Sequence, residues 1–99
     1  MMYRNEKLLK AVCTLPCMIC GLEGSTQACH SNQLRHGKGK GIKAHDWAIA
    51  SLCYKCHHDI DQGNKLSKEQ RRDMWQDAHE DTIAMLFERG WLTVETYPY

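Results

Sequence analysis

The sequence predicts a small α+β fold, and three observations support this prediction. The chain has 99 residues with 42% hydrophobic content, which suits one domain with a small core. It contains two Cys-x2-Cys pairs, and a domain of this size often needs such a cross-link. Short β-compatible segments lie between the pairs, and an apolar stripe at helical spacing follows the second pair. We therefore expect a single domain over residues 1–99, with a motif core at 16–63 and a packing helix at about 67–89.

The segments before the second cysteine pair predict one helix and two strands. Residues 5–12 carry apolar side chains at helical spacing, and Leu15 and Pro16 close this segment. Residues 26–29 and 47–52 are short and β-compatible, and they flank a glycine-rich polar loop. This arrangement favours two strands that are joined by a long polar connection.

Two further helices are predicted after these strands. The pattern is helical from Cys53 to Gly63, where a Gly-Asn pair indicates a stop. Ser67 and Gln70 match a capping box at the start of a longer helix. The apolar stripe of that helix consists of Met74, Trp75, Ala78, Thr82, Ile83, Leu86 and Phe87.

The basic residues are concentrated in one part of the chain. The net charge is only +1, but residues 1–68 carry ten Lys and Arg against five Asp and Glu, whereas residues 69–99 carry three against seven. The densest basic stretch, residues 35–45, contains no acidic residue. This loop favours contact with a polyanion such as a nucleic-acid backbone, and its cations are Arg35, Lys38, Lys40 and Lys43.

The two cysteine pairs predict a structural zinc site. Cys17 pairs with Cys20 and Cys53 with Cys56, each at the spacing of a zinc knuckle. Four thiolates complete a tetrahedral Zn²⁺ site, whose binding free energy contributes directly to folding. The alternative is a set of reduced, buried core cysteines, which the regular pairing disfavours.

Two cysteines remain outside these pairs. Cys13 lies four residues before Cys17. It fits either a ligand that replaces Cys17 or, as the favoured interpretation, a thiol that packs with the first helix. Cys29 directly precedes His30 near the end of the first predicted strand, beside residues that carry candidate chemistry.

Four polar residues predict a site for a divalent cation and a general base. His57 and Asp61 are four residues apart on a predicted helix, so both project from one face and can share a cation. His30 ends the first predicted strand and Asp46 precedes the second, and both reach that helix if the strands form a hairpin over it. The alternative for His57 and Asp61 is a surface pair, and for His30 a capped or core histidine.

The order of these motifs resembles that of HNH-type endonucleases of the ββα-metal superfamily, in particular small phage and prophage members. The similar stretches are PCMICG at 16–21, ACH at 28–30, GKGKGIKAHD at 37–46 and SLCYKCHHDIDQG at 51–63. The resemblance implies a zinc-stabilised ββα-metal core, to which the pattern adds an N-terminal helix and a long C-terminal helix. By position it implies His30 as the general base, Asp46 as its polar partner on the loop, and His57 and Asp61 as metal ligands.

The chain departs from the family pattern at three positions. Asp61 stands where the pattern has its last His, and carboxylates bind Mg²⁺ and Mn²⁺ well. Cys29 stands where many members have His or Asp, and thiolate is a poor ligand for a hard cation. The Asn of the pattern is missing before the second knuckle, and Asp46 takes its place.

The resemblance implies hydrolysis of phosphodiester bonds in DNA, in phage recombination or DNA processing. A neutral His30 can accept the proton of an attacking water, while Mg²⁺ or Mn²⁺ on His57 and Asp61 polarises the phosphate. The loop cations would hold the DNA backbone without reading sequence. Two alternatives are a non-catalytic zinc module that binds DNA or a protein, and a protein-interaction adaptor that uses the acidic last helix.

The ends and the hydropathy of the chain lead to expectations about compartment and partners. The first ten residues lack an apolar signal region, and no apolar run is long enough to cross a bilayer. We therefore expect a cytoplasmic protein with reduced thiols, DNA as a partner and no membrane association. The tail at 91–99 fits either an edge strand or a segment over the core, and Trp91 and Tyr97 can make a homodimer contact.

Overall fold

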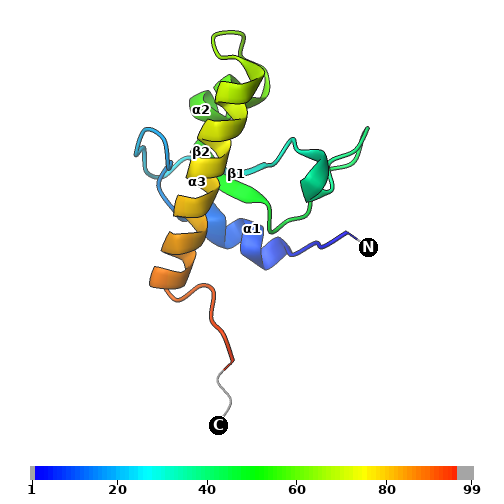
Figure 1. Cartoon of the computed structure of the whole chain (residues 1–99). Helices are drawn as coiled ribbons and strands as arrows, with labels where there is room; N and C mark the ends of the chain where they lie inside the picture. The colour runs from blue at the N-terminus through cyan, green and yellow to red at the C-terminus, as the bar shows by residue number, and fades with distance from the viewer. Residues whose placement is uncertain (1, 96–99) are drawn as a thin grey trace.

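The computed structural model describes residues 2–95, in which three α-helices pack around a two-stranded sheet (Figure 1). Along the chain the elements are α1 (Glu6–Val12), β1 (Thr26–His30), the 3-10 helix η1 (Leu34–His36), β2 (Ile49–Cys53), α2 (Tyr54–Asp61) and α3 (Lys68–Glu88). The predicted α+β class is confirmed, and each predicted helix and strand occurs close to its predicted bounds.

The two strands pair antiparallel along their whole length. Thr26 lies opposite Cys53, and His30 lies opposite Ile49, so the intervening loop closes a hairpin. Because β2 runs directly into α2, the register places the beginning of α2 beside the beginning of β1. The hairpin and α2 therefore bring the two cysteine pairs and the candidate site residues into one region.

One strand boundary differs from its prediction. The sequence predicts the second strand from Trp47, whereas β2 begins at Ile49. The Ala48 N–H donates a 3.0 Å hydrogen bond to the His45 carbonyl, which bends the chain in a turn at this point. Trp47 consequently stays 42% exposed and stacks on His45.

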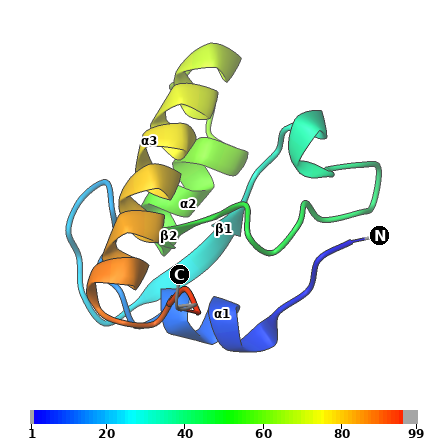
Figure 2. The ribbon, with the colours of Figure 1, turned by 60° about the horizontal axis from the view of Figure 1, so that its bottom comes forward.

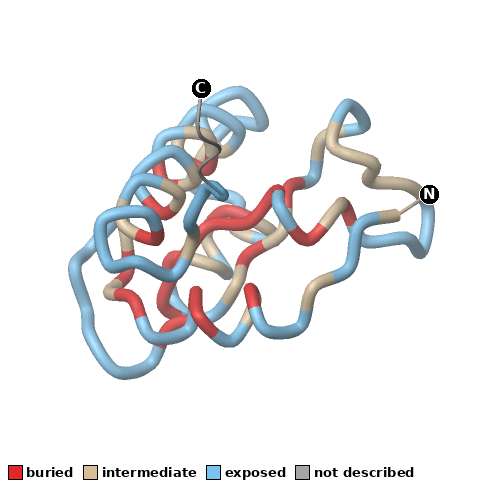
Figure 3. Tube along the Cα trace, turned by 90° about the horizontal axis from the view of Figure 1, so that it is seen from below, coloured by how far each residue is buried: buried red, intermediate tan, exposed pale blue. Residues whose placement is uncertain are grey.

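The hydrophobic core follows β2. All five residues of this strand are buried, and buried chain runs through the middle of the molecule (Figure 3). α3 packs on β2 and α1 packs on β1, as Figure 2 shows from another side. In one cluster Leu8 and Val12 of α1 meet Leu86 of α3, so the two helices also contact each other.

A buried hydrogen bond fixes α3 against the hairpin. Trp75 Nε1 donates to the Cys29 carbonyl oxygen at 2.9 Å. His79 stacks on the Trp75 ring, and its Nδ1 lies 2.7 Å from the Ile49 carbonyl oxygen. Both α3 side chains thus bind backbone carbonyl groups, one on each strand. These contacts fix the position of α3 on the sheet.

The capping box and most of the apolar stripe of α3 are confirmed. The Ser67 side chain accepts from the Gln70 N–H, and the Gln70 side chain accepts from the Ser67 N–H. Phe87 is an exception in the stripe, because it is 48% exposed. It follows Leu86, which faces the core, and one residue is a rotation of about 100° around a helix. The buried residues of α3 are Trp75, Ala78, Thr82 and Leu86.

The described part of the tail lies over the core. Residues 91–95 form no strand, and Leu92 packs on the cluster between α1 and α3. Trp91 is 55% exposed, while Tyr97 of the predicted dimer contact lies outside the described residues. Within residues 2–95, no helix combines the length and the apolar character that a membrane span requires.

Candidate functional site

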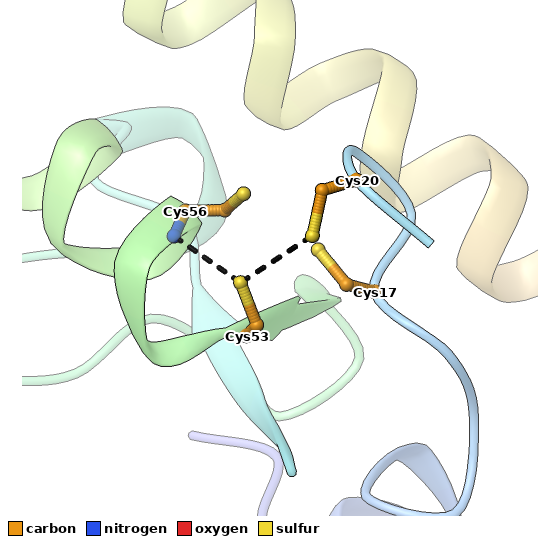
Figure 4. Close-up of side chains that lie close together, drawn as sticks. All are labelled: Cys17, Cys20, Cys53 and Cys56. Carbon is orange, nitrogen blue, oxygen red and sulfur yellow. Dashed lines mark hydrogen bonds between the residues drawn. The ribbon is translucent and has the colours of Figure 1, made fainter. Parts of the chain in front are cut away.

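The four cysteines of the two pairs converge on one point (Figure 4). Cys17 and Cys20 come from the loop after α1, Cys53 ends β2, and Cys56 lies in the first turn of α2. Their sulfur atoms all lie within 4.8 Å of one another, and the Sγ atoms of Cys20 and Cys53 are 3.6 Å apart. The predicted ligand set is therefore brought together, and it could hold a metal such as zinc.

The electrostatics of this cluster also fit a cation. Burial acts to raise the pKa of Cys17, but hydrogen bonds from the backbone of Cys20, Cys53 and Ile19 lower it to about 6. The pKa of Cys56 is raised, by burial first and then by its sulfur neighbours and the charge of Cys17. Four thiolates so close repel one another unless a cation lies among them.

The two cysteines outside the pairs have different surroundings. Cys13 is exposed at the end of α1 and lies outside the four-sulfur cluster, so the prediction that it packs with the helix is wrong. The helix ends at Val12, and Cys13 is its C-cap residue, whose side chain is exposed in the turn that follows. Cys29 is fully buried and lies beside α2.

A second cluster of ligand atoms forms where Cys29 of β1 meets α2. His57 and Asp61 project from one face of α2, with His57 Nε2 only 2.9 Å from Asp61 Oδ2. The Cys29 Sγ lies 4.0 Å from Asp61 Oδ1, and one ligand atom from each residue lies within 4.8 Å of the others. Burial, followed by the charge of Asp61, raises the pKa of Cys29, so this group stays a neutral thiol.

Two amide side chains orient the ligand atoms of this cluster. The Gln27 Oε1 lies 2.7 Å from His57 Nδ1, which therefore carries a hydrogen, and Asn32 Nδ2 donates to Asp61 Oδ1 at 2.9 Å. In the neutral ring, His57 Nε2 then keeps its lone pair and faces the Asp61 carboxylate. Two facing acceptors need a proton or a cation between them. Neighbouring ligands of an octahedral ion with bonds of about 2.1 Å lie about 3 Å apart, so a divalent cation fits this pair.

The carboxylate of Asp61 is ionised at neutral pH. Burial acts to raise its pKa. The hydrogen bond from His57, present when that ring carries a proton at Nε2, the hydrogen bond from Asn32 and the positive charges of His57 and Lys38 outweigh burial and lower the pKa. The group consequently offers a charged oxygen ligand. Asn32 and Gln27 were missed by the sequence reasoning, although Gln27 is two residues before Cys29 and alternation along a strand puts both on one face.

His30 and Asp46 form a second pair, as the sequence reasoning expected. The His30 Nε2 lies 2.8 Å from Asp46 Oδ1 and donates to it, which leaves Nδ1 as the accepting nitrogen of the neutral ring. Asp46 also accepts from the Asn5 N–H at 2.7 Å and from Arg4 Nη1 at 3.3 Å. These two N-terminal residues belong to no motif, so nothing in the sequence pointed to them.

The ionisation of Asp46 follows from these partners. Its side chain is only 5% exposed, and burial acts to raise its pKa. The hydrogen bonds from His30 and from the Asn5 backbone lower the pKa below its ordinary 3.8, as do the charge of the His30 ring when it is protonated and the charge of Arg4. Asp46 is therefore a carboxylate that holds the His30 ring in one orientation.

One member of the His30–Asp46 pair and both members of the His57–Asp61 pair open onto one cavity of about 380 Å³. His30 lines it together with His57 and Asp61. Lys38 and Lys43 of the basic loop also line this cavity, whereas Arg35 lines a different one. Lys40 lies on the exposed surface of the loop. All four loop cations were expected to hold the DNA backbone, whereas the structure places Lys38 and Lys43 at this cavity and the other two elsewhere.

The whole chain was compared with protein-family models, with curated proteins and with solved structures, and none of them matches. The assignment of a function consequently rests on the residues themselves. These are the two clusters of ligand atoms, the His30–Asp46 pair and the charged groups around their shared cavity.

Proposed function

We propose that the protein is a metal-dependent endonuclease of the HNH type, with a ββα-metal core that hydrolyses phosphodiester bonds in DNA. One observation carries this proposal. An oriented histidine, His30, and a pair of cation ligands, His57 and Asp61, line a single cavity that also holds Lys38 and Lys43. Phosphodiester hydrolysis requires a base, charge neutralisation on the phosphate and groups that position the backbone, and these residues supply each of them.

His30 is the general base of the proposed reaction. Because its Nε2–H is bound by Asp46, the neutral ring accepts the proton of the attacking water at Nδ1. Asp46 then stabilises the imidazolium that forms, since its carboxylate stays ionised in the folded protein. Asp46 is a positioning residue and does not itself take up the proton.

His57 and Asp61 would hold Mg²⁺ or Mn²⁺ in this protein. The bound cation supplies charge neutralisation at the phosphate and at the leaving oxygen. Gln27 and Asn32 keep His57 Nε2 and Asp61 Oδ2 turned toward each other, which reduces the cost of ordering them when a cation binds. Lys38 and Lys43 hold the DNA backbone beside them.

The four-sulfur cluster has a structural part in this proposal. Zn²⁺ on Cys17, Cys20, Cys53 and Cys56 would tie the loop after α1 to the start of α2. The next residue of α2 is His57, so zinc bound there would fix the helix turn that carries this proposed cation ligand. Placing a site on such a rigid element preserves its geometry.

The proposal is tested by plasmid nicking with Mg²⁺ or Mn²⁺ as the added cation. We expect His30→Ala to lower the nicking rate by about 10²- to 10⁴-fold, the usual contribution of a positioned general base. His58→Ala is the matched control, because His58 is the exposed histidine next to His57 on the same helix. Far-ultraviolet circular dichroism and zinc content should be unchanged in both variants. Nicking by His30→Ala at the wild-type rate would contradict the proposal.

A second candidate function is a non-catalytic zinc module that binds DNA or a protein. The observation that favours it is the neutral Cys29 thiol among the ligand atoms, because a thiol is a poor ligand for Mg²⁺. This function gives salt-sensitive DNA binding with no nicking under any divalent cation. The nicking experiment therefore separates the two candidates.

A further inference from the structure

A larger cavity adjoins the one that holds the candidate catalytic residues. It measures about 520 Å³ and lies where η1, the end of α2 and the first half of α3 meet. Its lining contains four cations against one carboxylate, Asp61. The four cations are Arg35, Lys68, Arg71 and Arg72. Three of them come from α3, so residues outside the motif core build most of this positive surface.

The two cavities share part of their walls. Asn32 and Asp61 line both of them and are joined by a 2.9 Å hydrogen bond. A chain molecule that leaves the first cavity past Asp61 therefore enters the second cavity directly. Asp61, one of the proposed cation ligands, lies at the boundary between the two cavities.

Two arginines of the larger cavity point to an anionic ligand. Arg71 Nε is buried, and no hydrogen-bond partner faces it among the described residues. A buried donor without an acceptor is unfavourable, and an oxygen of a bound anion would satisfy it. Arg35 is held in place from two sides, since it donates to Gln33 Oε1 at 2.6 Å and to Gln76 Oε1 at 3.2 Å. Its charge is thereby kept near α3.

The cavity also has an apolar side. Leu34 of η1 lines it and is 84% exposed, and Ile60 of α2 contributes a second aliphatic side chain. An exposed leucine beside several cations matches a ligand that is charged at one end and flat or apolar at the other. A nucleotide unit has these properties, because its phosphate is anionic and its sugar and base are less polar.

We propose that this cavity binds the stretch of nucleic-acid strand that continues from the candidate catalytic site, with its phosphates on the α3 cations and a sugar or base against Leu34. This inference rests on the proposed function. It extends the substrate-binding surface from the basic loop to the N-terminal half of α3, and it assigns Lys68, Arg71 and Arg72 to substrate binding.

The test is fluorescence anisotropy with a labelled single-stranded DNA oligonucleotide, titrated at several salt concentrations without added divalent cation. We expect the double variant Lys68→Gln with Arg72→Gln to bind more weakly. The plot of the logarithm of the binding constant against the logarithm of the salt concentration has a negative slope. This slope should become shallower by about 0.7 for each phosphate that the variant no longer neutralises. The matched control is Arg89→Gln, at the opposite end of α3. It should leave the slope unchanged.

Leu34→Ser tests the apolar side of the cavity separately. It should weaken binding of the oligonucleotide about threefold, while the salt slope stays as in the wild type because no charge is removed. Polyglutamate serves as a second probe. An equal weakening of polyglutamate and DNA binding in Leu34→Ser would overturn the nucleotide assignment in favour of an acidic peptide.

The outcomes separate this inference from the proposed function. If the wild type nicks plasmid and binds the oligonucleotide but the double variant keeps the wild-type slope, only the inference is overturned. If the wild type neither nicks plasmid nor binds the oligonucleotide at low salt, the proposed function is overturned as well. Thermal melts of each variant check that the fold is retained, which is expected because Lys68 and Arg72 are exposed.

Discussion

The two clusters of ligand atoms are built in opposite ways. In the four-sulfur cluster the ligands face one another, and three of the four cysteines are buried. In the cluster of Cys29, His57 and Asp61, two ligands line an open cavity, and each of these two is bound by an amide side chain. Structural zinc sites are closed by protein ligands, whereas catalytic sites keep a position open to substrate. The contrast fits the structural part that we propose for the first cluster and the catalytic part that we propose for the second.

The clusters are nevertheless neighbours along α2. Cys56 belongs to the first and His57 to the second, and one residue around a helix changes the direction of a side chain by about 100°. One helix turn therefore serves both clusters on different sides. Substitutions in each cluster can show whether the first cluster affects the stability of the fold and the second affects cation binding, although both lie on this turn.

The largest effect is expected from the removal of one sulfur ligand. Cys53→Ser should abolish tight zinc binding and leave the domain largely unfolded, because apparent zinc-binding free energies of about 10–16 kcal/mol match or exceed the usual stability of a domain. Zinc content and circular dichroism measure this. Cys13→Ser, at an exposed cysteine outside the cluster, should behave as the wild type. A Cys53→Ser protein that stays folded without zinc would show that the four-sulfur cluster does not stabilise the fold.

A smaller effect is expected at Asp46, the carboxylate that holds His30, the proposed general base. The folded-state pKa of Asp46 lies below its ordinary 3.8, so its charge stabilises the fold above about pH 4, and this contribution disappears as the pH falls through the folded pKa. Asp46→Asn should lower the free energy of unfolding by about 2 kcal/mol at pH 7, because it weakens buried hydrogen bonds to a charged group. The difference from the wild type should shrink toward pH 3.

Urea denaturation at both pH values measures this change. The control is Asp59→Asn, which removes an exposed pair with Lys55 and should have no measurable effect. An equal loss of stability at pH 7 and pH 3 would show that the carboxylate charge of Asp46 is not the cause.

The smallest effect is expected at Cys29. In Cys29→Ser the affinity of the second cluster for Mn²⁺ should change less than about twofold, since a neutral thiol contributes little to a hard cation. The affinity for added Zn²⁺, which prefers sulfur, should fall about tenfold. Isothermal titration of protein already loaded with one zinc per chain gives both values. A large loss of Mn²⁺ binding would instead identify Cys29 as a ligand of the working cation.

The sequence predicts the regular parts of this molecule and much of its site. The Cys-x2-Cys spacing, the capping box at Ser67 and the four-residue spacing of His57 and Asp61 are local patterns, and local geometry decides them. The contact of His30 with Asp46 could be anticipated, because a hairpin brings the end of one strand to the beginning of the next.

The remaining features depend on contacts between distant segments. Arg4 reaches the basic loop, where it donates to the Ala44 carbonyl at 2.6 Å as well as to Asp46. No pattern links a residue near the N-terminus to a position 42 residues later. The grouping of Arg35 with the cations of α3 has the same origin, since it depends on how η1 sits against that helix.

The burial of Trp75 gives the protein an internal optical reporter. Two of its three tryptophans, Trp47 and Trp91, are 42% and 55% exposed, while Trp75 is 3% exposed and bound to the backbone carbonyl of Cys29. A water-soluble quencher therefore extinguishes the emission of the first two and spares the third. The fraction of the fluorescence that the quencher does not reach therefore reports, in real time, whether α3 is packed on β1, the strand that carries Cys29 and His30.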